Sequence, residues 1–126
     1  MPNILLIEDM KGVQTSMAMI LTNAGYSVTT ADNGRHGIET FETKEFDLVI
    51  TDILMPEMDG SEVLFALMKK PSKPPMIAIS AGGGSINASE ALRFASKIAD
   101  AVLEKPFSRN ELLEVVERLT SNPTKS

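Results

Sequence analysis

Ionisable or hydroxyl side chains close, or directly follow, four separate apolar runs of this chain. They are Glu8 and Asp9, then Asp52, Ser80 and Lys105. Three carboxylates brought close together repel one another, and they all stay ionised only when a cation lies among them. Because these ligands are oxygens, with no histidine or cysteine beside them, they favour a hard divalent ion such as Mg²⁺. The first prediction is therefore a magnesium site.

The same residue types indicate phosphoryl transfer. A bound divalent ion neutralises an incoming phosphoryl group and holds it in line with an attacking oxygen. We expect Asp52, on the middle strand of the chain, to be the nucleophile. Lys105 would supply positive charge to the phosphoryl oxygens, and the Ser80 hydroxyl would donate a hydrogen bond to one of them. The backbone carbonyl of Leu54 is a further candidate metal ligand.

Five apolar runs alternate with segments of helical period, and this alternation must position the reactive residues. Strands are predicted over 4–7, 26–31, 48–52, 76–80 and 101–103, and helices over 13–24, through Ile38 and Phe41, after Gly60, over 87–97 and after Ser108. Alternating strands and helices predict a doubly wound α/β fold, with a parallel sheet and helices on both faces. Since all strands of a parallel sheet end at the same edge, the reactive residues should meet there.

Length and composition restrict the function. At 126 residues and 43% hydrophobic, the chain suits one domain, predicted over residues 1–121 with a short polar tail over 122–126. A net charge of −5 argues against sequence-independent binding to nucleic acid or an anionic membrane. The chain has no cysteine and no apolar run near the ~20 residues of a membrane span. We expect a cytoplasmic protein without membrane insertion or direct nucleic-acid contact, whose partners are proteins or small ions.

The residues after the strands resemble the receiver domain of two-component response regulators. The resemblance covers essentially the whole chain, in order and at the family's spacing. It is carried by Glu8-Asp9, by Asp52 with Met55-Pro56-Glu57-Met58-Asp59-Gly60, by Ser80-Ala81 and by Lys105-Pro106-Phe107.

This resemblance implies a flavodoxin-like sheet with strand order 2-1-3-4-5. It implies that Asp52 accepts phosphate from a histidine kinase or a histidine phosphotransfer protein, and that the phosphorylated domain then acts on a downstream target protein. It also implies that Mg²⁺ is held by Glu8, Asp9 and Asp52, that Ser80 and Lys105 bind the phosphoryl group, and that the Lys105–Pro106 peptide bond is cis. The domain would promote its own dephosphorylation but would not be an enzyme acting on other substrates.

One position departs from the family pattern. Receivers usually carry Tyr or Phe three residues before the lysine, as a switch residue that moves together with the serine, and here the position is Val102. We therefore expect the signal to pass through the glycine-rich segment 81–85 and the helix over 87–97, which become ordered by contacts with the phosphate.

Other interpretations were compared with the receiver. Each polar residue taken singly is typical of an ordinary turn or loop. A magnesium-dependent phosphatase with an aspartyl-phosphate intermediate would need a general acid where this chain has Leu54. A receiver that binds partners without phosphorylation would not need the complete set of site residues. The leading prediction is a stand-alone response regulator, with a receiver excised from a longer regulator as the alternative. His36 is predicted to be a surface residue away from the carboxyl edge of the sheet.

Overall fold

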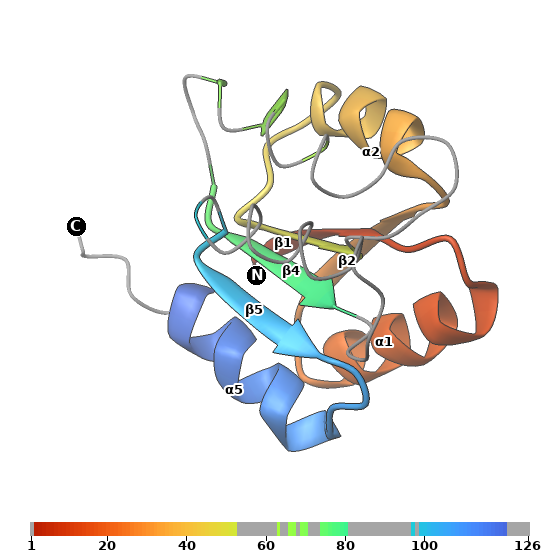
Figure 1. The fold of residues 1–126 in the computed structure, drawn as a ribbon, viewed down its shortest axis with the longest axis vertical. Coiled ribbons are helices and arrows are strands. Elements are labelled where there is room, and N and C mark those ends of the chain that lie inside the picture. The colour runs from red at the N-terminus through yellow and green to blue at the C-terminus, as the bar shows by residue number, and fades with distance from the viewer. Residues whose placement is uncertain are drawn as a thin grey trace.

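Five parallel strands form the centre of the protein in a computed structural model, which describes residues 2–52, 63, 66–67, 69–70, 74–80, 97 and 99–120 (Figure 1). The strands are β1 (Asn3–Ile7), β2 (Ser27–Ala31), β3 (Leu48–Asp52), β4 (Met76–Ser80) and β5 (Ala101–Glu104). Their order in the sheet is β2-β1-β3-β4-β5. The predicted α/β class and strand order are confirmed, and each predicted strand end lies within one residue of the observed one.

The central strands are apolar on both faces because helices cover both faces of a parallel sheet. Every residue of β3 and β4 is buried. The strand register then determines which residues follow at the carboxyl edge. Ile7 pairs with Thr51, so Glu8 emerges beside Asp52, while Ser80 pairs with Glu104 directly before Lys105.

Three described helices cover the sheet: α1 (Lys11–Asn23), α2 (Gly34–Phe41) and α5 (Arg109–Thr120). In Figure 1, α1 and α5 lie on one side of the sheet and α2 lies on the other. Alternate strand residues accordingly form two cores. The core under α1 and α5 contains Ile4, Leu6, Ile50, Ile77, Met17, Leu21, Leu112 and Val116, and the core under α2 contains Leu5, Ile7, Val49, Ala78, Ile38 and Phe41. Among the described residues, no helix is long and apolar enough to cross a membrane.

Local sequence signals account for the helix ends. Gly25 follows α1 with a φ of 103°, a conformation that favours glycine, and it ends the helix as predicted. Before α5, the Ser108 hydroxyl accepts a hydrogen bond from Glu111 N at 3.0 Å, and the Glu111 carboxylate accepts one from Ser108 N at 2.8 Å. This pair is a capping box, as the spacing predicts.

Several predicted elements lie outside the described residues. They are most of the helix after Gly60, the segment 81–85, nearly all of the helix over 87–97 and the tail over 122–126. Within the helix predicted after Gly60, Val63 and Leu67 are described, and both are buried in the core under α2.

Gly37 and Gly12 provide a matched test of how closely α2 packs on the sheet. A Cβ atom on Gly37 in α2 would lie 2.7 Å from Cγ1 of the buried Ile7 and closer still to its Cδ1, whereas one on Gly12 in α1 would meet nothing within 4 Å. We expect Gly12→Ala to raise the free energy of unfolding by about 0.5–1 kcal/mol. Gly37→Ala should lower it by about 1–3 kcal/mol because α2 must move away from β1. Urea denaturation measures both, and a stabilising Gly37→Ala would contradict the close packing of α2 on Ile7.

Candidate functional site

Three carboxylates meet at the carboxyl edge of the sheet. Glu8 and Asp9 directly follow β1, and Asp52 is the last residue of β3. One carboxylate oxygen of each residue lies within 4.8 Å of those of the other two. Glu8 is only 1% exposed and Asp52 4% exposed, so bulk water screens their charges poorly. We call these three residues the acidic cluster.

Lys105 contacts the acidic cluster from the end of β5. Its Nζ donates a hydrogen bond to Asp52 Oδ2 at 2.9 Å and lies 3.6 Å from Glu8 Oε1. Its main-chain N–H donates to the carbonyl of Ser80 at 2.7 Å, and this bond fixes the end of β5 against the end of β4. The Lys105–Pro106 peptide bond is cis. The buried Ser80 therefore shares this edge with the lysine and the cluster.

The pKa values of two of these groups show that the charges do not balance. Burial and the negative charge of Asp52 raise the pKa of Glu8 from 4.5 to about 7, although the hydrogen bond from Met10 N and the charge of Lys105 act in the opposite direction. Burial acts to lower the pKa of Lys105, but its hydrogen bond with Asp52 and the charges of Asp52 and Glu8 outweigh that effect and raise it. One lysine thus only partly compensates three carboxylates.

The acidic cluster fits a divalent cation. Glu8 Oε2 accepts a hydrogen bond from Met10 N at 3.2 Å, whereas the buried Glu8 Oε1 has no hydrogen-bond partner among the described residues. A buried carboxylate oxygen without such a partner is costly unless a cation compensates it. Three carboxylates with oxygen ligands alone, close enough to share one ion, match the ligand preference of Mg²⁺.

The remaining predicted site residues are only partly placed. Leu54 lies outside the described residues, so its carbonyl remains a predicted ligand. Val102 in β5 pairs with Ala78 of β4 and packs, partly buried, on the core under α2. The proposed transmission of the signal through 81–85 and 87–97 remains a prediction, because these segments lie outside the described residues except for Lys97.

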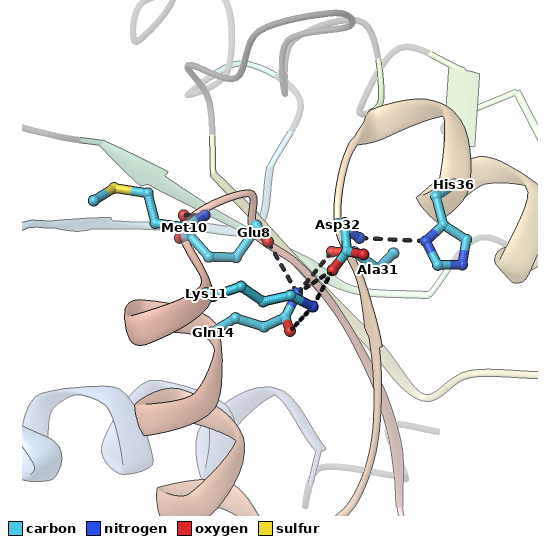
Figure 2. A network of polar contacts seen from close by, with 7 residues as sticks. All are labelled: Glu8, Met10, Lys11, Gln14, Ala31, Asp32 and His36. Carbon is cyan, nitrogen blue, oxygen red and sulfur yellow. Dashed lines mark hydrogen bonds and ion pairs between the residues drawn. The ribbon is translucent and has the colours of Figure 1, made fainter.

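A second polar cluster beside the site was not predicted (Figure 2). Gln14 of α1 is 5% exposed and donates hydrogen bonds to the main chain at the ends of β1 and β2. A signal for it exists in the sequence, since Gln14 stands at i−3 and i−7 from the buried Met17 and Leu21, on the helix face that otherwise carries apolar residues.

The prediction for His36 was right about exposure and wrong about position. His36 is exposed, but its Nδ1 accepts a hydrogen bond from the main-chain N–H of Asp32 at 3.3 Å. Asp32 follows β2, and α2 begins at Gly34, so the first turn of α2 lies at the same carboxyl edge. Figure 2 shows His36 on the far side of Asp32 from Glu8.

Comparison with known proteins shows the family to which the chain is related. The family model of the response regulator receiver domain matches residues 4–117. The cell cycle response regulator CtrA of Brucella ovis is 32% identical over 110 residues, which cover 87% of this chain and 46% of CtrA. The chain therefore spans about half the length of the curated relatives that it matches.

Solved structures agree in fold along nearly the whole chain. The signal receiver domain of a histidine kinase from Syntrophus aciditrophicus has a TM-score of 0.89 at 27% identity, covering 100% of this chain and 95% of that one. The receiver domain of a sensor histidine kinase from Pseudomonas aeruginosa PAO1 has a TM-score of 0.85 at 26% identity, covering 95% of this chain and 98% of that one. That structure has a magnesium ion coordinated in its active-site cleft.

The raised pKa of Glu8 predicts how stability depends on pH without metal. Between pH 4.5 and about 7, the folded protein holds a proton on Glu8 that the unfolded chain has released. The free energy of unfolding should therefore fall as pH rises through this range, by up to about 3 kcal/mol. In Glu8→Gln, which lacks this titrating carboxyl group, the free energy of unfolding should fall less over the same pH range. Urea denaturation in a chelating buffer from pH 4.5 to 8 measures both proteins, and identical pH profiles would contradict the raised pKa.

Proposed function

This chain belongs to the response regulator receiver domain family, and from that premise we propose that it accepts a phosphoryl group on Asp52 and signals through phosphorylation-dependent contact with another protein. Receiver domains of two-component systems are signalling modules. The observation that carries the proposal is the partly buried contact of Asp52 with Lys105, at 2.9 Å, beside a cluster of three carboxylates.

The proposed reaction uses side chains that already lie together. An oxygen of Asp52 attacks the phosphorus atom of a phosphohistidine, the phosphorus–nitrogen bond breaks, and the imidazole leaves with the electron pair and takes up a proton. Lys105 Nζ is close enough to Asp52 to follow the developing negative charge on the phosphoryl oxygens. The buried Ser80, at the end of the neighbouring strand β4, is proposed to donate a hydrogen bond to one of these oxygens.

We also propose that the acidic cluster holds Mg²⁺ through Glu8, Asp9 and Asp52, with the Leu54 carbonyl as a further ligand. When bound, the ion supplies the charge that neutralises the phosphoryl group and the attacking carboxylate. Support comes from the buried Glu8 Oε1, which has no hydrogen-bond partner among the described residues, and from the magnesium ion in the related Pseudomonas receiver domain.

The partners of this chain are proposed from the phosphoryl-transfer chemistry and from the receiver family. The phosphoryl donor is a histidine kinase or a histidine phosphotransfer protein, and the recipient of the signal is a target protein, both in the cytoplasm. Detection of the native protein in cell extract distinguishes a receiver of this length from a longer regulator of which the receiver is one domain.

Mass spectrometry tests the phosphoacceptor directly. After incubation with a small phosphodonor such as acetyl phosphate and Mg²⁺, we expect one phosphoryl adduct on the wild-type protein and none on Asp52→Asn. Asp47→Asn is the matched control, because Asp47 is exposed and lies at the opposite end of β3. An undiminished adduct in Asp52→Asn would disprove the assignment, and multiple turnover of an unrelated phosphate ester would favour the phosphatase.

Lys105 should affect metal binding and phosphorylation in opposite directions. Its charge lies beside Asp52 and Glu8, so it competes with a cation for the same carboxylates. We expect Lys105→Met to bind Mg²⁺ about 5- to 10-fold more tightly, yet to accept phosphate more slowly because the phosphoryl oxygens lose a positive partner. Calorimetry and the rate of adduct formation measure the two effects.

Lys11→Met is the control for this prediction. Lys11 is an exposed lysine whose ion pair joins Asp32, outside the acidic cluster, and its loss should change neither quantity appreciably. Weaker Mg²⁺ binding in Lys105→Met would show that the lysine supports the metal site instead of competing with it.

A further inference from the structure

We propose that Gln14 is a positioning residue of the acidic cluster: its buried side-chain amide fixes the main chain at Glu8 and thereby the direction of the Glu8 carboxylate. This inference rests on the proposed function, since it concerns how the chain prepares its metal ligands. The observation behind it is the polar cluster of Figure 2, which joins the ends of β1 and β2 to α1.

Gln14 donates all its hydrogen bonds through one nitrogen, while its Oε1 accepts one from Lys11 Nζ at 3.5 Å. Its Nε2 donates to the carbonyl of Glu8 at 3.0 Å, to the carbonyl of Ala31 at 3.2 Å and to Asp32 Oδ1 at 3.1 Å. An amide nitrogen has only two hydrogens, so at least one of them is shared between two acceptors. Ala31 is the last residue of β2 and Glu8 directly follows the neighbouring strand β1, so the amide bridges the carboxyl ends of the two strands.

Glu8 is fixed at several points around its carboxylate. Its main-chain N–H donates to the carbonyl of Ala31 at 3.1 Å, and its carbonyl accepts from Gln14. Its side-chain Oε2 accepts from Met10 N at 3.2 Å. With these groups held, Oε1 remains directed toward Lys105 and the other carboxylates of the cluster. A change at the Glu8 carbonyl therefore turns the carboxylate relative to Asp52.

Lys11 and Asp32, the exposed residues of the polar cluster in Figure 2, are expected to affect the position of Glu8 less than Gln14 does. Lys11 Nζ forms an ion pair with Asp32 at 2.9 Å, with side chains 72% and 52% exposed. Such exposed pairs contribute little, whereas a buried amide that satisfies two main-chain carbonyls is costly to remove. The positioning effect is therefore assigned to Gln14 and not to Lys11.

Loss of stability alone must be distinguished from loss of positioning. Gln14→Leu removes the donor, and Met17→Ala destabilises the same buried face of α1 without a contact to Glu8. The Mg²⁺ dissociation constant of each folded variant, measured by calorimetry well below its unfolding temperature, separates the two effects. We expect at least about 10-fold weaker binding in Gln14→Leu and a value within about twofold of wild type in Met17→Ala, with Lys11→Met as a second control.

A double-mutant cycle shows whether Gln14 acts through Glu8. If it does, Gln14→Leu should weaken Mg²⁺ binding little further in a Glu8→Gln background. Equal losses in both backgrounds, or unchanged binding in Gln14→Leu, would overturn the inference. If Gln14→Leu fails to fold, Gln14→Asn keeps the amide but shortens its reach, and the same loss of affinity is expected. A wild-type protein that neither binds Mg²⁺ nor forms the phosphoryl adduct would refute the proposed function as well.

Discussion

The structure depends on one electrostatic constraint: three carboxylates with one lysine beside them are held at the buried edge of a sheet. Their oxygens lie within 4.8 Å of one another, and two of the three residues are almost fully buried. Without a metal ion this arrangement is unfavourable, because burial, and after it the negative charge of Asp52, raises the pKa of Glu8. A site that a divalent ion would stabilise in this way supports the proposed binding of metal and phosphate.

The fold makes this arrangement possible through main-chain contacts. The parallel register brings the ends of β1 and β3 together, and the hydrogen bond from Lys105 N to the Ser80 carbonyl fixes the end of β5 against β4. On the other side, α2 packs through Gly37 on the side chain of Ile7, the residue that precedes Glu8. The carboxylates cannot move apart readily because the strands that carry them are packed on both faces.

Much of this could be predicted from the sequence, where local patterns are strong. Buried strands such as β3 and β4 are continuous apolar runs that end in a polar residue, so their bounds follow from the pattern. The strand order was implied by the resemblance to receiver domains. The capping box of Ser108 and Glu111 depends likewise on a short local spacing. The convergence of Glu8, Asp52 and Lys105 needed only the assumption of a parallel sheet.

The features that were not predicted depend on tertiary contacts between segments far apart in the sequence. The position of Gln14 on the apolar face of α1 signals burial, but only the packing of α1 against both strand ends shows which carbonyls its amide contacts. His36 was predicted away from the carboxyl edge because the sequence does not show that α2 begins only three residues after β2. The roles of Leu54 and of the segment 81–85 lie outside the described residues, so the route by which phosphorylation would reach a partner past Val102 remains a prediction.

The most direct measurement of the central claim is the number of protons released when Mg²⁺ binds, obtained by calorimetry in buffers of different ionisation enthalpy. A metal ion requires ionised ligands, so binding must displace the proton that Glu8 holds with a pKa of about 7. We expect one ion per chain, with proton release approaching one at pH 6, declining above pH 7 and disappearing in Glu8→Gln. Absence of saturable binding, or binding with no proton release at pH 6, would contradict a cation site built on these carboxylates.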